Sequence, residues 1–146
     1  GLTHFFPAPE AIADADLSGL GLTGGRISAL KAFAGAVAKG AVTFDPAATL
    51  DEKIAEFCLV PGIGEWTAHY IALRAVGEPD AFPASDLGLR KAAGGASPVT
   101  PRALEAMAES WRPWRGYAAL LLWMAPNIET QDLETRRAEP RALAAD

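Results

Sequence analysis

The carboxylate of Asp86 is the side chain whose place in the sequence most favours chemistry. It follows a loop that contains Pro79 and Pro83, and it opens a short predicted helix, Leu87 to Ala93. Backbone N–H groups at a helix start keep such a carboxylate ionised, so it can stabilise a developing positive charge or orient a water. The alternative is structural: Ser85 or Asp86 caps the helix and contributes about 1 kcal/mol.

A second candidate is a turn built from two glycines, within the run LVPGIGEWTAHYIALR. Gly62 and Gly64 flank Ile63, which lets the chain reverse tightly between two helices and exposes backbone N–H groups at the start of the second. With the helix dipole, these donors form a site for one phosphate without any basic side chain. Ile63 is predicted to tuck back between the helices. The alternative is a simple helix-to-helix turn with glycine as a C-cap.

Apolar residues at helical spacing predict the elements that position these groups. No segment alternates with period two and is rich in Val, Ile, Thr or Tyr, so we expect an all-α fold, a helical bundle with a helix-hairpin-helix motif. One domain is predicted over residues 1–128 and a poorly packed tail over 129–146, where charges become dense. Beyond the N-terminal prolines, helices are predicted over Arg26 to Gly40, Leu50 to Cys58, Trp66 to Val76, Leu87 to Ala93, Pro101 to Trp111 and Trp114 to Met124.

Composition limits the classes of partner. The chain has 146 residues, 50% hydrophobic and 21% charged, which suits one globular core, and it has no uncharged apolar run long enough to span a membrane. Its one cysteine, Cys58, excludes an internal disulfide and a four-cysteine metal or iron–sulfur site, and favours the reducing cytoplasm. The net charge of −5 argues mildly against nucleic acid, but residues 60–128 carry six basic and six acidic side chains.

Three blocks in order resemble the helix-hairpin-helix DNA glycosylase superfamily, and most of all its 3-methyladenine DNA glycosylase II branch. They are the glycine-turn run, DAFPASDLGLRKA over Asp80 to Ala92, and AESWRPWRGYAALLLWMA over Ala108 to Ala125, with a weaker match in FFPAPEAIADADL. The hairpin alone occurs in many DNA-binding proteins, whereas the three blocks in this order are specific. They correspond to the C-terminal catalytic part of those enzymes. We therefore expect an incomplete catalytic domain from a longer protein, whose missing N-terminal elements can leave the chain inactive on its own.

The resemblance implies a monofunctional DNA N-glycosylase that hydrolyses the base–sugar bond of alkylated purines, of the 3-methyladenine type, in base excision repair. The superfamily's catalytic aspartate falls on Asp86, whose charge would stabilise the oxocarbenium character of the sugar. Members that also cut the DNA backbone carry a lysine where this chain has Trp66, and an indole cannot form a Schiff base. The implied partner is double-stranded DNA with alkylated bases. A monomer in the bacterial cytoplasm, associated with the nucleoid through DNA, is expected.

The resemblance also assigns the surroundings of the reacting base. The target nucleotide leaves the base stack, and electron-rich rings attract a positively charged alkylated purine. Trp66 and Tyr70, which share one helix face, and Trp123 match the aromatic positions that line the base pocket. The alternative is that these rings are ordinary core. The phosphate-binding positions are Gly62, Ile63, Gly64 and Thr67.

No cofactor is expected, and no side-chain metal ligands are needed. In the resembled family the hairpin often holds a monovalent cation, Na or K, through carbonyl oxygens, which here would come from Cys58, Val60 and Ile63.

Two functions without catalysis stay open. A non-catalytic helix-hairpin-helix DNA-binding module needs Gly62 and Gly64 but is indifferent to Asp86. A structural helical domain that binds a protein partner predicts neither DNA affinity nor any effect of the glycines. Loss of excision on changing Asp86 separates the enzyme from both.

Overall fold

The computed structural model describes residues 3–95 and 97–124, so the predicted tail over 129–146 lies outside the described residues. Within these residues every regular element is a helix, which confirms the predicted all-α fold. The chain divides into two compact units, Gly1–Ala81 and Phe82–Asp146. None of the described helices is long and apolar enough to cross a membrane.

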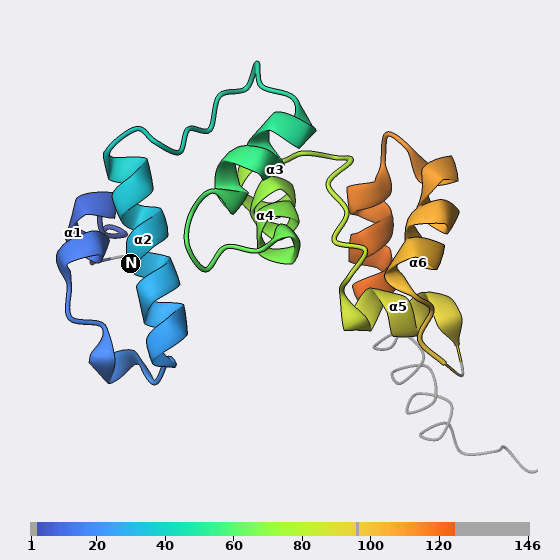
Figure 1. Cartoon of the computed structure of the whole chain (residues 1–146), viewed down its shortest axis with the longest axis horizontal. Helices are drawn as coiled ribbons and strands as arrows, with labels where there is room; N and C mark the ends of the chain where they lie inside the picture. Colours follow the sequence, from blue (N-terminus) through green and yellow to red (C-terminus); the bar gives the residue numbers. More distant parts are fainter. Residues whose placement is uncertain (1–2, 96, 125–146) are drawn as a thin grey trace, which may run out of the picture. The chain divides into compact units, whose positions relative to one another are not determined.

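The first unit is built from α1 (Pro9–Asp14), the 3₁₀ turn η1 (Ser18–Leu20), α2 (Gly24–Ala38), α3 (Leu50–Cys58) and α4 (Glu65–Ile71). α1 starts with a proline in its first turn and lies along α2 (Figure 1). α4 continues directly into a π-helical turn, η2 (Ala72–Val76), which ends at Gly77 in the left-handed conformation. The helix predicted over Trp66 to Val76 therefore forms, but it changes from an α-helix to a wider π-helical turn part-way along.

The core of the first unit joins α3 to α4 and η2. Phe57 of α3 is completely buried, as are Ala68 and Ala72 on the facing helix, whose small side chains let the two helices approach closely. Phe33 of α2 packs edge-on against Phe57, with ring centroids 6.0 Å apart. Because residues from three helices meet at Phe57, this cluster positions the turn between α3 and α4.

A buried ion pair ties α3 to the segment that follows η2. The side chain of Lys53 is 1% exposed, and its Nζ donates hydrogen bonds to the Ala48 carbonyl at 2.7 Å and to Glu78 Oε1 at 2.5 Å. Such a pair is stable only while both partners are present, because either charge alone would be poorly solvated. The pair thus fixes the chain where it leaves the hairpin helix.

The second unit contains α5 (Leu87–Gly94), α6 (Pro101–Ala108), the 3₁₀ turn η3 (Glu109–Trp111) and a helix over 115–124. Leu89 and Leu104 are completely buried in its core, beside Ala108 and Ala119. Trp111 packs edge-on against Phe82, with ring centroids 6.0 Å apart. The helix predicted over Pro101 to Trp111 is confirmed as α6 followed by η3. α5 and α6 share this core, which positions the start of α5.

Candidate functional site

The glycine turn connects α3 to α4 as the sequence predicts. The Ile63 N–H donates to the Val60 carbonyl at 3.0 Å, and Gly64, extended at φ −93° and ψ 171°, is the N-cap of α4. Ile63 packs against the core cluster of the first unit, so its predicted place between the helices is confirmed. The next residues, Glu65 and Trp66, are exposed. The N–H groups of this first turn have no partner further back in the helix, which leaves them suited to an acceptor from outside.

The two glycines of the turn have different structural roles. Gly62 has φ +86°, and a Cβ placed on it would lie 2.6 Å from the Cβ of Ala29 in α2. Gly64 has a backbone conformation that any residue adopts, and a Cβ there would meet nothing within 4 Å. Gly62 is therefore required by the fold, whereas Gly64 is a favourable N-cap at which no contact excludes a side chain.

Two predicted pocket residues form a pair on the hairpin helix. The rings of Trp66 and Tyr70 stack in parallel, with centroids 5.4 Å apart and planes 8° apart. Trp66 is 40% exposed and Tyr70 39% exposed, so the pair is not ordinary core. Thr67, between them in sequence, is half-buried. Stacked rings at the surface present an aromatic face that can attract a cation or another ring.

Asp86 is the N-cap of α5. Its Oδ1 accepts a hydrogen bond from the Leu89 N–H at 2.9 Å, and the carboxylate lies at the positive end of the helix dipole. The Asp86 N–H donates to the Pro83 carbonyl at 2.9 Å, which closes the proline-containing turn before the helix. The capping role considered above is therefore real. The two roles are compatible, because a cap bond fixes and stabilises the charged form of the carboxylate.

Trp123 approaches the same carboxylate from the helix over 115–124. Its indole Nε1–H donates to Asp86 Oδ1 at 2.9 Å, and the ring is half-buried against the core cluster of the second unit. The sequence predicts Trp123 as an aromatic pocket residue but does not predict this bond. No sequence signal identifies it, because the two residues are separated by 37 positions.

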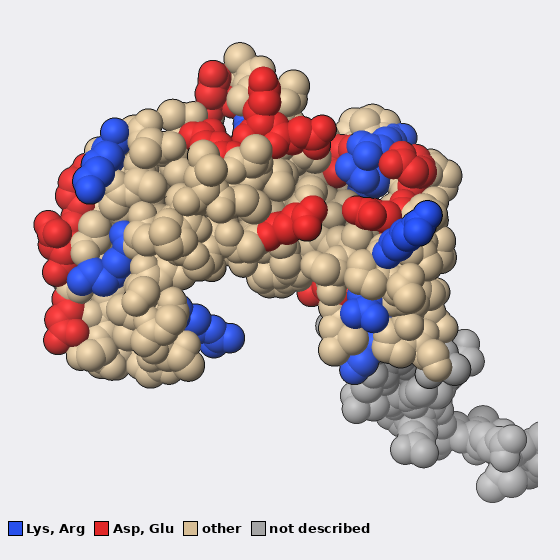
Figure 2. All heavy atoms as spheres, in the orientation of Figure 1, with Lys and Arg blue, Asp and Glu red and all other residues tan. Residues whose placement is uncertain are grey.

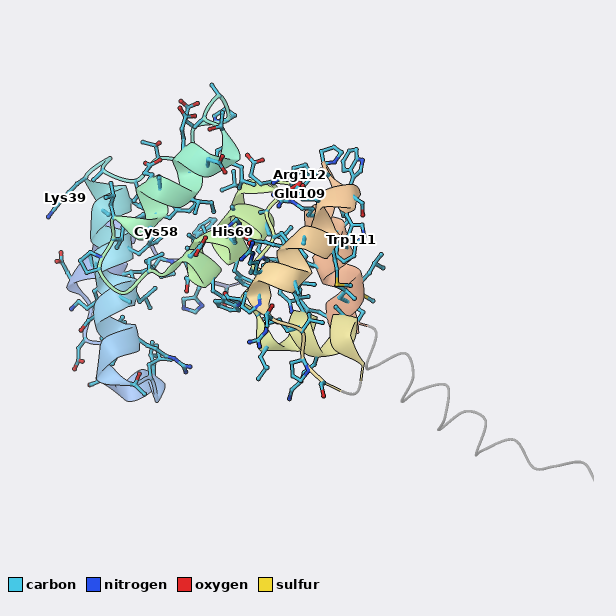
Figure 3. The ribbon with its side chains drawn as sticks, turned by 45° about the vertical axis from the view of Figure 1, so that its right-hand side comes forward. Lys39, Cys58, His69, Glu109, Trp111 and Arg112 are labelled. Atoms are coloured by element: carbon cyan, nitrogen blue, oxygen red, sulfur yellow. The ribbon has the colours of Figure 1, made fainter. Side chains whose placement is uncertain are left out.

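Three arginine side chains of the second unit are bonded to the protein or buried in it. Arg90 Nε donates to the Val99 carbonyl at 2.6 Å, and Arg115 is only 8% exposed. Arg112 pairs with Glu109, whose side chains lie together in Figure 3. On the face drawn in Figure 2, acidic side chains gather over α3, and basic ones are scattered. These surfaces favour anion binding through backbone groups over binding through lysine or arginine.

Cys58, at the end of α3 (Figure 3), does not have the properties of a nucleophile. Although the residue is exposed, the surrounding chain desolvates its sulfur, and this effect, followed by the negative charge of Glu65, raises the pKa of the thiol. The thiol is therefore protonated at neutral pH, and a catalytic role for this cysteine is not supported.

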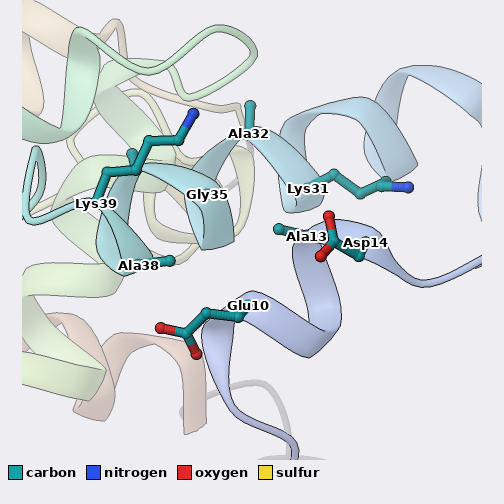
Figure 4. Close-up of a pocket in the computed structure, with 9 residues that line it drawn as sticks. Glu10, Ala13, Asp14, Lys31, Ala32, Gly35, Ala38 and Lys39 are labelled. Atoms are coloured by element: carbon teal, nitrogen blue, oxygen red, sulfur yellow. The ribbon is translucent and has the colours of Figure 1, made fainter.

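A hollow of about 670 Å³ between α1 and α2 lies away from all these residues (Figure 4). Glu10, Asp14, Lys31 and Lys39 line it with charges of both signs, and Lys31 Nζ donates to the Ala15 carbonyl at 2.9 Å. None of the predicted site residues belongs to it. We therefore assign it no part in the candidate site.

Comparison with known proteins gives a consistent set of relatives, although no family model matches the chain. Over 123 residues it is 41% identical to the probable bifunctional transcriptional activator/DNA repair enzyme AlkA of Mycobacterium tuberculosis, covering 84% of this chain and 25% of that protein. It is 35% identical to DNA-3-methyladenine glycosylase 2 of Escherichia coli, covering 81% of this chain and 42% of that protein. The chain thus spans less than half the length of these curated relatives.

A solved structure agrees with the sequence relatives. The 3-methyladenine DNA glycosylase Mag1 of Schizosaccharomyces pombe, solved in complex with abasic DNA, matches with a TM-score of 0.74 and 28% identity, over 82% of this chain and 63% of that one. Shared helices, the hairpin and these sequence identities lead to one conclusion: over about four-fifths of its length, the chain belongs to the helix-hairpin-helix DNA glycosylases of the 3-methyladenine DNA glycosylase II type.

Proposed function

We propose that the chain serves in a monofunctional DNA N-glycosylase that hydrolyses the base–sugar bond of alkylated purines in duplex DNA. The observation that carries this proposal is the Asp86 carboxylate, which a helix N–H and an indole N–H hold at the start of α5. The family membership supports the class of reaction, and the geometry supports Asp86 as the residue that performs it.

Asp86 would act on the sugar by electrostatics. Cleavage of a glycosidic bond develops positive charge on the sugar, and a preorganised carboxylate stabilises that charge without moving. The same group can orient the water that completes hydrolysis. Position 66 holds an indole, which forms no Schiff base, so the product is an abasic site in an uncut strand.

The stacked pair of Trp66 and Tyr70 would receive the flipped base. Alkylation of a purine at N3 or N7 leaves the base positively charged, and exposed aromatic faces attract such a cation more than an unmodified base. The parallel stack supports this part of the proposal because it fixes the orientation of both rings. Selectivity for alkylated purines would then follow from charge as well as shape.

The glycine turn would bind one DNA phosphate. Exposed N–H groups at the start of α4 provide donors without basic side chains, and the open space at Gly64 permits a close approach. Gly62, Ile63 and Thr67 would shape this site from within the hairpin.

A monovalent cation is compatible with the same turn. No group of three or more His, Cys, Asp or Glu side chains among the described residues is placed to hold a metal, so carbonyl oxygens are the donors to consider. The Val60 carbonyl accepts the Ile63 N–H, and a carbonyl oxygen has a second lone pair for an ion. Cys58, Val60 and Ile63 would hold Na or K, which would neutralise charge beside the phosphate.

The experiment measures release of 3-methyladenine and 7-methylguanine from methylated duplex DNA under single-turnover conditions, with DNA binding measured in parallel. It compares this chain with its Asp86→Asn variant. Both are also tested as chimeras, in which the chain or its variant replaces the matching residues of the Escherichia coli relative. Asparagine keeps the helix cap but removes the charge. Asp45→Asn is the control, since Asp45 also accepts a backbone N–H, from Ala47 at 2.8 Å, in an exposed loop.

We expect excision by the wild type, its loss in Asp86→Asn with DNA binding retained, and no change in Asp45→Asn. DNA binding without excision in the chain and the exchanged protein alike would instead identify a non-catalytic DNA-binding module.

A further inference from the structure

We propose that Trp123 is a positioning residue that holds the Asp86 carboxylate through its indole N–H, and that Gly88 keeps the space in which this bond forms. This inference rests on the proposed function of Asp86 but assigns Trp123 a role different from lining the base pocket.

Two donors meet at one oxygen of the carboxylate. Trp123 Nε1 and the Leu89 N–H both lie 2.9 Å from the same oxygen, Oδ1 of Asp86. A carboxylate with two donors on one oxygen cannot rotate without breaking both bonds, so the direction of its other oxygen is fixed as well. An indole N–H is a donor only, so it favours the ionised carboxylate over a protonated one.

The indole itself is held in place from behind. Its ring packs against the buried cluster that includes Leu89, Leu104 and Ala119. Ala119 is on the helix over 115–124, as Trp123 is, and Leu89 is on α5, the helix that Asp86 caps. The ring therefore links the core of the unit to the carboxylate, and its N–H is aimed by packing.

Gly88 stands directly beside this contact. A Cβ at position 88 would lie 3.0 Å from Asp86 Oδ1 and 3.4 Å from Trp123 Cδ1. Glycine inside the first turn of a helix costs stability relative to alanine. The close approach of the carboxylate and the indole explains why a side chain is absent from this position.

The contact itself is tested first, in the chain as it is and without catalysis. Nuclear magnetic resonance of ¹⁵N-labelled protein resolves the indole N–H groups, and Trp123→Phe assigns the Trp123 signal. Asp86→Ser keeps a capping side chain but is too short to reach the indole. We expect the Trp123 N–H signal to lie downfield in the wild type, and to move upfield and exchange faster with solvent in Asp86→Ser. A Trp123 signal unchanged by Asp86→Ser would overturn the proposal.

The consequence for excision is tested next, in whichever protein shows wild-type activity. Trp123→Phe keeps an aromatic ring, although a smaller one, and removes the donor, and Trp114→Phe makes the same change at an indole that is 57% exposed. A positioning role predicts that Trp123→Phe lowers the maximal single-turnover rate by about tenfold to a hundredfold, with the half-saturating protein concentration unchanged. Gly88→Ala should lower the same rate by a smaller factor without unfolding the protein, and Trp114→Phe should leave it unchanged.

The outcomes separate this inference from the function on which it rests. Full activity of Asp86→Asn would contradict the proposed function. Inactivity of Asp86→Asn together with an unchanged rate in Trp123→Phe would overturn the positioning role alone. A loss in Trp123→Phe that appears in the half-saturating concentration, with the maximal rate kept, would also overturn it, because a pocket wall acts on binding of the base.

Discussion

The hairpin unit and the carboxylate unit present their candidate groups in opposite ways. In the first unit the proposed phosphate site is made of main-chain N–H groups, and the side chain absent from Gly64 matters more than any side chain present. In the second unit one carboxylate would carry the proposed chemistry, and an N–H of α5 and an indole N–H both bond to it. A site made of backbone groups is therefore disturbed by a substitution that adds a side chain. A site made of one side chain is disturbed by a substitution that changes its chemical group.

The units also use charge differently. The first unit uses the pair of the buried Lys53 and the partly exposed Glu78 for its own cohesion. The second keeps its key charge half-buried at a helix start, where the charge is stabilised and can still act on a ligand. Five variants test this contrast.

The largest expected effect comes from breaking the ion pair in the hairpin unit. Glu78→Ala leaves the completely buried Lys53 ammonium without its carboxylate, so we expect the free energy of unfolding to fall by about 3 to 5 kcal/mol. Urea unfolding followed by circular dichroism of the helices measures it. Glu105→Ala, at an exposed position of α6, is the control and should change stability by less than about 0.5 kcal/mol. Equal effects of the two changes would show that the ion pair does not hold the unit.

The two hairpin glycines should separate stability from DNA binding. Gly62→Ala forces a side chain into the left-handed region and against Ala29, so we expect a loss of about 3 kcal/mol in stability. Gly64→Ala should lower the melting temperature only slightly, because alanine is a poorer N-cap than glycine. It should weaken binding to duplex DNA about tenfold, since the new methyl group separates the phosphate from its donors. Thermal melts and fluorescence anisotropy measure the two quantities. Unchanged DNA affinity in Gly64→Ala would contradict the proposal that the glycine turn binds a phosphate through its backbone.

The smallest effect concerns the caps of one helix in each unit. The Thr49 N–H, and then its hydroxyl, hold the pKa of Glu52 below its usual range, within a capping box at the start of α3. A lowered carboxyl pKa stabilises the fold above the unfolded pKa, and this contribution disappears as the pH falls through the folded value. Glu52→Gln should therefore lower the melting temperature at pH 7, with a difference that narrows at acidic pH.

Thr100 provides the comparison in the second unit. Its hydroxyl caps α6 by accepting the Ala103 N–H, and no carboxylate takes part in this cap. Thr100→Ala should cost about 1 kcal/mol by the same melts, and the loss should stay constant over the acidic range in which the effect of Glu52→Gln narrows. A parallel pH dependence in both variants would refute the assignment to Glu52.

Much of the fold could be predicted from the sequence because local rules govern it. Apolar spacing predicted the helices, glycine spacing predicted the reversal between α3 and α4, and the residues before Leu87 predicted a carboxylate at a helix start. What could not be predicted depends on contacts between distant residues. Asp86 and Trp123 are 37 positions apart, and Lys53 and Glu78 are 25 apart. A side chain at Gly62 would clash with α2, and no local sequence pattern predicts that α2 lies there.

The double duty of Asp86 has an evolutionary consequence. Asparagine caps a helix about as well as aspartate, so a single exchange of a carboxylate oxygen for an amide would remain invisible to any selection that acts on folding, solubility or abundance. Only the repair of damaged DNA would maintain the acid at this position. On the proposed function, a descendant no longer selected for repair would readily acquire asparagine at this position. It would then be a folded protein that binds a damaged base without removing it.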